Sequence, residues 1–313
     1  MSATLPVLQR CALLSCLLLM ACGGGGGGGA TVSAPPAPAP PAAAEPVPPP
    51  VTPPVTPPAT SPPPPATGPA PAGYQLVWAD EFDLPGLPDA TRWAYDTDRN
   101  RLGWWNSERQ YYAAARFENS VVEGGRLRIT ARREALSTLP DWGGQAYSSA
   151  RLITRGKAAW TYGFFEIRAK MPCGTGTWPA IWMLGTGGVW PNDGEIDILE
   201  HVGRTPDQIL GTIHTPITGG SGNGSRINLP TVCTAFNDYQ MHWTADEIAI
   251  GVNGNVYHRY RNPRTGRAAW PFDAPQYMLL NIAVGGTLGG TVDDSIFPRT
   301  MEIEHVRVWQ AVR

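Results

Sequence analysis

The sequence is poor in the residues that build metal centres, and it carries almost no excess of charge. Its 313 residues include five cysteines and five histidines, and the histidines are scattered rather than clustered. Scattered histidines argue against a catalytic zinc site. The formal net charge of −2 argues against a nucleic-acid partner, which usually requires a basic face. We therefore expect neither zinc chemistry nor nucleic-acid binding.

Several other signatures are missing. The chain has no Gly-rich phosphate loop and no GxSxG motif, and it shows little helical periodicity. Its one marked hydrophobic run, residues 11–21, is too short to cross a bilayer as a helix. These absences argue against nucleotide binding, serine-hydrolase chemistry and a membrane-spanning domain.

The amino terminus is typical of an export signal. Arg10 precedes the apolar run, so residues 1–21 are interpreted as a signal peptide. Residues 19–22, Leu-Met-Ala-Cys, resemble a bacterial lipobox, which implies cleavage before Cys22 and lipid attachment to its sulfur. The alternative is a plain signal peptide with an incidental cysteine. The lipobox implies a membrane-anchored lipoprotein of the cell envelope, and Gly23 in place of an Asp retention signal allows outer-membrane or surface sorting.

A spacer follows the anchor. Residues 23–29 are all glycine, and proline dominates the stretch up to Pro71. Such a segment cannot bury enough apolar surface to fold. Residues 22–72 are therefore predicted to form a lipidated, Gly- and Pro-rich linker that holds the following domain away from a membrane. Binding to a proline-reading partner is the other interpretation of this composition.

Residues 73–313 are predicted to form one domain, which contains all 12 tryptophans. Their length suits a single all-β sandwich. The domain contains two cysteines, Cys173 and Cys233. An even pair in an exported domain forms a disulfide in many proteins, and two buried free thiols are the alternative. We expect a monomer.

Short alternating runs indicate β-structure. Leu127 and Ile129 alternate with polar residues, and Asn253-Gly254 between two alternating runs is a strong hairpin signal. Longer strands are expected around 162–172 and 277–286, and another around 305–310. Turn residues separate these runs about every ten positions. The pattern predicts an all-β jelly-roll sandwich of two curved antiparallel sheets, with a concave substrate cleft.

The most unusual stretch is GEIDILEHVG, residues 194–203, which places three acids among isoleucine and leucine. Neighbouring carboxylates raise one another's pKa, so a purely structural strand would rarely accept them. Ile196 and Ile198 occupy the opposite face, which indicates that one side of this strand is packed. Glycoside hydrolysis needs two carboxyl groups across a sugar bond, one ionised and one protonated. The strand therefore predicts a glycosidase, and an exposed strand with solvated acids is the alternative.

The spacing of the acids requires an irregular strand. Side chains alternate with period two, so Glu195 and Asp197 share a face while Glu200 would point the other way. A β-bulge near Ile198-Leu199 would return Glu200 to the first face. The two Glu Cα atoms would then lie roughly 13 Å apart along the strand, and inward-leaning side chains could flank one glycosidic bond.

These residues resemble glycoside hydrolase family 16. The segment GEIDILE resembles the bulged E-x-D-x-x-E signature of its laminarinase-like endo-β-1,3-glucanases. Further blocks resemble the family in the same order along the chain: 76–83, 103–112, 149–172, 176–185, 239–248, 281–286 and 297–310. The resemblance therefore covers nearly all of residues 75–311.

The family resemblance implies roles for the acids. Glu195 would be the nucleophile, Asp197 the assisting acid and Glu200 the general acid/base of a double displacement with retention of configuration. No cofactor would be needed for catalysis, and the partner would be a β-glucan polysaccharide.

The resemblance also implies residues that bind or support the substrate. Sugar sites pair aromatic platforms with fixed hydrogen-bonding groups. The tryptophans before the acids match family tryptophans that line the cleft, although a core position is the alternative for Trp178. Of Trp104 and Trp105, one is expected to stack on a sugar and the other to be core, and we assign the stacking role to Trp105. The full set of expected substrate-binding residues is Trp178, Trp182, Trp190, Asn106, Glu108, Arg151, His214 and Trp105. For His214, a surface or core histidine is the alternative.

The chain departs from the family pattern in two places. Leu288 stands where many laminarinases have a stacking Trp, and Phe164 stands where an Arg is usual. Both departures leave the preferred substrate open.

Relatives often hold one structural Ca²⁺, and the matching positions here are Glu81, Gly124 or Gly125, and Glu304, the last replacing the usual Asp. The resemblance thus implies a calcium site made by Glu81, Gly124 and Glu304.

Three functions follow from these observations. The first is an endo-β-glucanase that acts on β-1,3 or mixed β-1,3/1,4 glucan. The second is a relative that cuts a galactan, as agarases and carrageenases do, or that transfers glucan chains. The third is a non-catalytic carbohydrate-binding protein, which the intact acid triplet argues against.

Overall fold

The structure, a computed structural model, describes residues 70–312. The predicted signal peptide, Cys22 and most of the predicted linker lie outside the described residues. The first strand begins at Tyr74, directly after the expected start of the domain. Within the described range, no helix is both long enough and apolar enough to cross a membrane.

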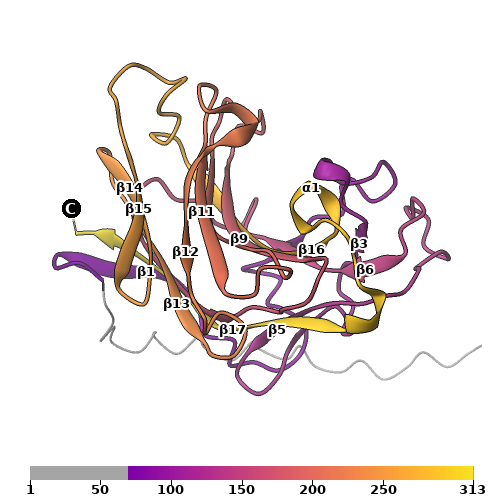
Figure 1. Ribbon diagram of the computed structural model, residues 1–313. Coiled ribbons are helices and arrows are strands. Elements are labelled where there is room, and N and C mark those ends of the chain that lie inside the picture. The colour runs from indigo at the N-terminus through magenta and orange to yellow at the C-terminus, as the bar shows by residue number, and fades with distance from the viewer. Residues whose placement is uncertain (1–69, 313) are drawn as a thin grey trace, which may run out of the picture. The chain divides into compact units, whose positions relative to one another are not determined.

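Two large antiparallel sheets make up most of the described chain (Figure 1). The seven-stranded sheet has the order β12 (Asn223–Asn228), β11 (Gln208–His214), β10 (Glu195–His201), β9 (Thr177–Gly185), β16 (Gln276–Val284), β7 (Arg151–Ile153) and β2 (Ala94–Tyr95). The eight-stranded sheet has the order β15 (Asn255–Arg261), β14 (Glu247–Val252), β13 (Asn237–Trp243), β8 (Gly163–Lys170), β17 (Arg299–Ala311), β5 (Leu127–Ala131) and β4 (Ser120–Val122), with β1 (Tyr74–Asp80) also paired to β17. This architecture confirms the predicted jelly-roll sandwich.

Smaller elements complete the fold. Strands β3 (Gln110–Tyr112) and β6 (Tyr147–Ser149) form a short parallel pair. The helices are short, and α1 contacts η1, as Figure 1 shows near β3. They are η1 (Trp105–Ser107), η2 (Gly219–Ser221), α1 (Gly286–Gly289) and η3 (Asp294–Ile296).

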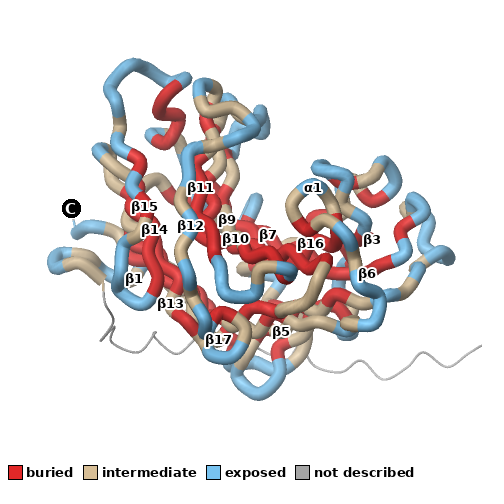
Figure 2. The backbone as a smooth tube through the Cα atoms, viewed as in Figure 1, coloured by how far each residue is buried: buried red, intermediate tan, exposed pale blue. Residues whose placement is uncertain are grey.

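The core lies between the two large sheets and follows the alternation of the sequence. In β5, Leu127 and Ile129 are fully buried while the residues between them are partly exposed. Asn253 and Gly254 both have positive φ, and they form the predicted turn between β14 and β15. Figure 2 shows the buried stretches running along the strands, with exposed loops at their ends. The local patterns therefore predicted the strands correctly.

Strand β10 contains the expected bulge. Its register shifts between Asp197 and Leu199 against β9, and between Asp197 and Glu200 against β11. Ile198 and Leu199 are both fully buried in the same core. Two successive side chains thus enter the core, which turns Glu200 back to the face of Glu195 and Asp197.

The structure joins Cys173 and Cys233 in a disulfide, with their Cα atoms 5.7 Å apart. Cys173 lies in the loop before β9, and Cys233 lies in the loop between β12 and β13. Of the two arrangements that the sequence allowed, the structure has the disulfide. The bond joins the loop between β8 and β9 to the loop between β12 and β13.

The residues that the family resemblance assigned to calcium do not form a calcium site in this structure. The Glu81 carboxylate accepts hydrogen bonds from Nε and Nη2 of Arg307 at 2.7 and 2.8 Å. The Glu304 carboxylate accepts from Nε of Arg168 at 2.7 Å and lies 3.4 Å from Nη2 of Arg126. A calcium ion needs carboxylate oxygens that face a shared point, but arginines occupy these two acids. Gly124, the third expected ligand, lies in the turn before β5. Because both acids are paired with arginine, we assign no role to Ca²⁺.

We predict that the bulge is held by the burial of Leu199. Replacement of Leu199 by Ala removes a fully buried side chain and should lower the free energy of unfolding by about 2–5 kcal/mol. Urea unfolding measures this change. The matched control is Leu84→Ala, because Leu84 is exposed and its loss should change stability by less than about 0.5 kcal/mol. Equal effects of the two substitutions would contradict the role of Leu199.

Candidate active site

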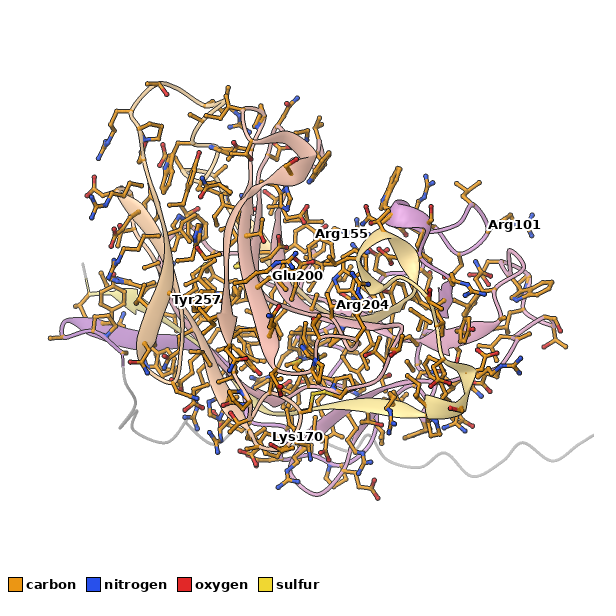
Figure 3. The ribbon with its side chains drawn as sticks, viewed as in Figure 1. Arg101, Arg155, Lys170, Glu200, Arg204 and Tyr257 are labelled. Atoms are coloured by element: carbon orange, nitrogen blue, oxygen red, sulfur yellow. A yellow bond between two sulfur atoms is a disulfide. The ribbon has the colours of Figure 1, made fainter. Side chains whose placement is uncertain are left out.

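The three acids of β10 meet on one face of the seven-stranded sheet. Glu195 and Glu200 are partly buried and Asp197 is almost fully buried. Glu200, labelled in Figure 3, is paired across the sheet with Ala180 of β9 and Leu210 of β11. The predicted triplet is therefore assembled in space, and the bulge is the reason.

An indole N–H holds each of the two outer acids. Trp178 of β9 donates its Nε1–H to Oε1 of Glu200 over 2.9 Å. Trp190, in the loop before β10, donates to Oε2 of Glu195 over 2.6 Å. Trp178 is nearly buried, whereas Trp190 is 52% exposed. The two tryptophans thus fix the carboxyl groups, and the ring of Trp190 stays open to a ligand.

His214 of β11 belongs to the acid cluster. Its Nε2 lies 3.3 Å from Oδ2 of Asp197, and its Nδ1 donates to the carbonyl oxygen of Gly219 over 3.0 Å. Burial alone would lower the pKa of His214, but the contact with Asp197 and the charges of Asp197 and Glu195 raise it to about 10. A protonated His214 offsets part of the negative charge of the triplet.

The carboxyl groups themselves have raised pKa values. Burial is the largest cause for Glu200, and the charge of Glu195 adds to it, so the pKa of Glu200 is raised to about 7 against the opposing Trp178 hydrogen bond. Burial and the charges of Glu195 and Glu200 also raise the pKa of Asp197. The contact with His214 opposes this rise in the pKa of Asp197.

Glu195 differs from Glu200 in the number of groups that favour its ionised form. Burial raises the pKa of Glu195, and four neighbours oppose that rise. They are the positive charges of His214 and Arg151 and the hydrogen bonds from Asp197 and Trp190. The site therefore pairs a carboxyl group whose ionised form is supported by several neighbours with one whose pKa is about 7. Such an asymmetric pair can supply a nucleophile and a general acid.

Glu195, Asp197 and His214 also offer ligand atoms within 4.8 Å of one another, as a metal site would. His214 contacts Asp197, and its charge opposes the rise in the pKa of Glu195. We therefore interpret this cluster as an acid–base site.

Arg151 of β7 lies beneath the site rather than open to it. Its guanidinium lies 5.1 Å from the ring centre of Trp104 and 4.7 Å from that of Trp182, and its Nε lies 3.1 Å from Oδ2 of Asp96. Arg151 is almost fully buried by these contacts. Its charge lowers the pKa values of Glu195 and Glu108. Arg151 therefore supports the site electrostatically.

Trp182 is tied to the neighbouring strands. Its indole N–H donates to Oδ1 of Asn281 on β16 over 2.7 Å, and Nδ2 of Asn281 donates to the Tyr112 hydroxyl over 3.0 Å. The sequence analysis did not single out Asn281 or Tyr112, although both stand in segments that resemble the family. It also missed Arg226 of β12, whose positive charge opposes the rise in the pKa of Glu200. Nothing in the polar run around Arg226 distinguishes it in sequence.

The remaining residues that were predicted to bind substrate lie in η1 or directly after it. Glu108 accepts a hydrogen bond from Nε2 of Gln110 over 2.9 Å, and Asn106 is exposed beside it. Trp104 is core, while Trp105 is 61% exposed. The Arg99 guanidinium lies 4.0 Å from the centre of the Trp105 ring. A sugar that stacks on Trp105 would therefore use the ring face away from Arg99.

The two departures from the family pattern have different positions. Phe164 lies on the eight-stranded sheet, where it packs against Trp309 and His242. It therefore lies on a different sheet from the acids of β10. Leu288 lies in α1, and its carbonyl oxygen accepts a hydrogen bond from Nη1 of Arg204 over 2.5 Å.

Comparison with known proteins gives consistent matches. A family model described as glycosyl hydrolases family 16 matches residues 107–304. A beta-glucanase of Rhodothermus marinus is 47% identical over 254 residues, which are 76% of this chain and 86% of that protein. The crystal structure of SCLam, a non-specific endo-beta-1,3(4)-glucanase, aligns with a TM-score of 0.76 at 50% identity over 78% of this chain and 93% of that one. The laminarinase of Rhodothermus marinus aligns with a TM-score of 0.71 at 47% identity, covering 77% and 98% of the two chains.

We predict that the Trp178 indole lowers the pKa of Glu200. Replacement of Trp178 by Phe removes the N–H donor that favours the ionised carboxylate, so the pKa of Glu200 should rise above its value of about 7. A titration of ¹³C-labelled glutamate carboxyl groups by NMR measures the change.

The matched control is Trp182→Phe. The Trp182 indole donates to the Asn281 amide rather than to a carboxylate, so this variant should leave the pKa of Glu200 close to its starting value. An unchanged or lower pKa in Trp178→Phe would contradict the assignment.

Proposed function

The chain belongs to glycosyl hydrolase family 16, and from this premise we propose that it is an endo-acting β-glucanase that cleaves β-1,3 or mixed β-1,3/1,4 glucan with retention of configuration. The observation that carries the proposal is the return of Glu200 to the face of Glu195 and Asp197. Without that return, two carboxyl groups could not act on one glycosidic bond.

In the proposed first step, Glu195 attacks the anomeric carbon while Glu200 gives its proton to the leaving glycosidic oxygen. The pKa of about 7 keeps much of Glu200 protonated near neutral pH, as a general acid requires. Trp190 and the charge of His214 support the ionised form of Glu195. The products are a glycosyl ester on Glu195 and a free chain end.

In the proposed second step, Glu200, now ionised, takes a proton from water, which attacks the same carbon and releases Glu195. Asp197 lies between the two acids and hydrogen-bonds Glu195, with His214 behind it. As negative charge leaves Glu195 and later returns, the Asp197–His214 pair can adjust the position of its shared proton. We assign Asp197 the assisting role on this basis.

Indole and polar groups around the acids would hold the sugar rings. Trp190 is the exposed aromatic beside Glu195, and Trp105 is the exposed aromatic on η1. Asn106 and Glu108 present polar groups between η1 and Gln110. In a variant of SCLam, a glucan oligosaccharide occupies the active site. We propose that the glucan of this protein lies across the same face of the seven-stranded sheet.

Two substitutions test the chemistry. Glu195→Gln and Glu200→Gln each remove an ionisable carboxyl group and should lower kcat on laminarin by at least about 10²–10⁴-fold, with unfolding midpoints unchanged. The matched control is Glu247→Gln on β14 of the eight-stranded sheet, which should keep its activity. Parental activity in either active-site variant would end the assignment for that residue.

Product stereochemistry tests retention. With an activated aryl glucoside and azide, Glu200→Ala should give a β-glycosyl azide. Azide takes the place of water and attacks the glycosyl ester on Glu195 from the side that the missing Glu200 side chain leaves open. An α-linked azide would indicate inversion. Parallel release of reducing ends from laminarin, lichenan, agarose and carrageenan separates glucan hydrolysis from the galactan alternative, and product lengths reveal chain transfer.

We also propose that the mature protein is an envelope lipoprotein anchored through Cys22, with residues 23–72 as its spacer. The Leu-Met-Ala-Cys sequence supports this proposal. Cys22→Ala should move the protein from the membrane fraction to the soluble fraction, because a diacylated cysteine supplies the two chains that stable anchoring needs. Membrane retention equal to the parent would refute lipidation.

A further inference from the structure

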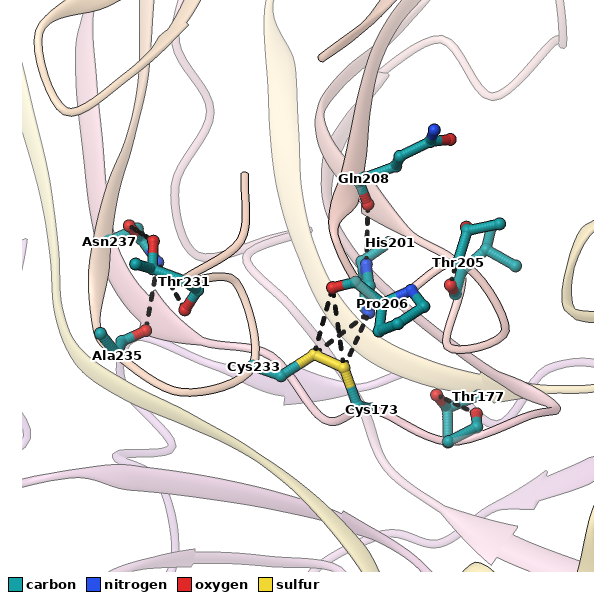
Figure 4. The surroundings of a disulfide bond; sticks show 12 residues. Cys173, Thr177, His201, Thr205, Pro206, Gln208, Thr231, Cys233, Ala235 and Asn237 are labelled. Atoms are coloured by element: carbon teal, nitrogen blue, oxygen red, sulfur yellow. Dashed lines mark hydrogen bonds between the residues drawn. A yellow bond between two sulfur atoms is a disulfide. The ribbon is translucent and has the colours of Figure 1, made fainter. Parts of the chain in front are cut away.

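The back of the catalytic strand carries a cluster that the proposed hydrolysis does not use. His201 follows Glu200 on β10 and is fully buried on the opposite face. Its Nε2 lies 3.6 Å from the sulfur of Cys173 and 3.6 Å from the sulfur of Cys233. Figure 4 shows His201 and the Pro206 carbonyl facing the two sulfur atoms.

The state of the His201 ring follows from its other contact. Nδ1 lies 2.9 Å from the carbonyl oxygen of Gln208, which can only accept, so Nδ1 carries the proton. In this tautomer Nε2 has a lone pair that faces the two sulfurs. A disulfide has no S–H, so neither sulfur can donate a proton to it.

A neutral histidine fixed in this way has the form of a metal ligand. Metal-binding histidines usually donate the other ring N–H to a carbonyl or carboxylate, which orients the ring toward the metal. From Zn–S and Zn–N bonds of about 2.3 and 2.0–2.1 Å, ligand atoms of a tetrahedral zinc lie roughly 3.5 Å apart. In the oxidised protein the sulfur–nitrogen separations of 3.6 Å are already close to this value, and after reduction the two sulfurs would move apart to roughly 3.8 Å to bind one zinc.

A backbone carbonyl oxygen is the fourth potential ligand atom. The carbonyl oxygen of Pro206 lies 3.8 Å from the sulfur of Cys173 and 3.6 Å from that of Cys233. One ligand atom from each of Cys173, His201 and Cys233 falls within 4.8 Å of the others. Both cysteines are only partly buried, so a reductant and an ion can reach them.

We propose that Cys173, Cys233 and His201 form a binding site for a soft divalent cation of the zinc class when the disulfide is reduced, with the Pro206 carbonyl oxygen beside the fourth position. Thiolate and imidazole ligands in a tetrahedral arrangement select such ions. A dithiol reductant breaks the S–S bond by supplying two electrons and two protons and is oxidised to its own disulfide. Binding of Zn²⁺ then releases both thiol protons to solvent.

A metal bound at this site would contact β10 on the face opposite to the three acids. The disulfide joins the loop before β9 to the loop before β13, and the metal would join the same two loops and, through His201, the end of β10. The metal would therefore hold β10 one residue from Glu200. A reducing environment would therefore exchange one cross-link for the other when zinc is present.

Cobalt binding to the full chain tests the site without any glucan. The reduced protein, freed of metal by a chelator, should bind one Co²⁺ with the strong visible bands of tetrahedral thiolate coordination, and Zn²⁺ should remove these bands. The oxidised protein should show no such bands. Cys233→Ser and His201→Asn should each weaken Co²⁺ binding at least about 100-fold in the reduced state, beyond the usual effect of an outer-shell change.

The controls separate this site from other ligands. Every variant is processed as the parent is and has the same cysteines outside the proposed site, so differences between variants report on that site. The matched control is His258→Asn, because His258 is also buried but hydrogen-bonds Ser225 instead; it should bind Co²⁺ as the parent does. Equal Co²⁺ spectra in the parent and Cys233→Ser, or equal spectra before and after reduction, would overturn the proposal.

Folding is checked by circular dichroism of the parent chain. If reduction without metal disturbs the native spectrum, Zn²⁺ should restore it. A disturbed spectrum that Zn²⁺ leaves unchanged would also overturn the proposal, since a metal that occupies the cross-link must stabilise the folded chain. Both readouts are independent of glucanase activity.

Discussion

The site depends on one packing constraint, the burial of two successive side chains from β10 in the same core. Ile198 and Leu199 both pack between the sheets, and this is incompatible with a regular strand. The extra residue rotates Glu200 to the face of Glu195 and Asp197. Hydrophobic burial thus assembles the three carboxyl groups of the candidate active site, although both apolar side chains point away from them.

Gathering three carboxyl groups has an electrostatic cost that the surrounding residues reduce. His214 contributes a positive charge next to Asp197, and the indoles of Trp178 and Trp190 donate to the outer acids. These contacts are unequal, so Glu195 receives more support for its charge than Glu200. This inequality is what the proposed mechanism requires of two chemically identical side chains that take opposite roles.

Strand β10 is constrained on both faces. Its front face carries the acids, and its back face carries His201 against the Cys173–Cys233 disulfide. The disulfide joins the β8–β9 loop to the β12–β13 loop, and each of these loops connects the two large sheets. The proposed metal site uses the same three side chains and would preserve that connection after reduction.

The sequence by itself determined the acid triplet, the need for a bulge, the hairpin at Asn253-Gly254 and the alternating strands. These features rest on local spacing, and strand geometry converts spacing into direction over a few residues.

Only the tertiary structure decided the rest, because each remaining question concerned partners that are distant in the chain. It separated Trp104 from its neighbour Trp105, placed Arg151 between two indoles, and joined Cys173 to a cysteine sixty positions away. It also gave arginine partners to Glu81 and Glu304, the acids expected to bind calcium. Local patterns carry no information on which distant side chain will neutralise a charge or cover a ring, since sheet packing alone brings those groups together.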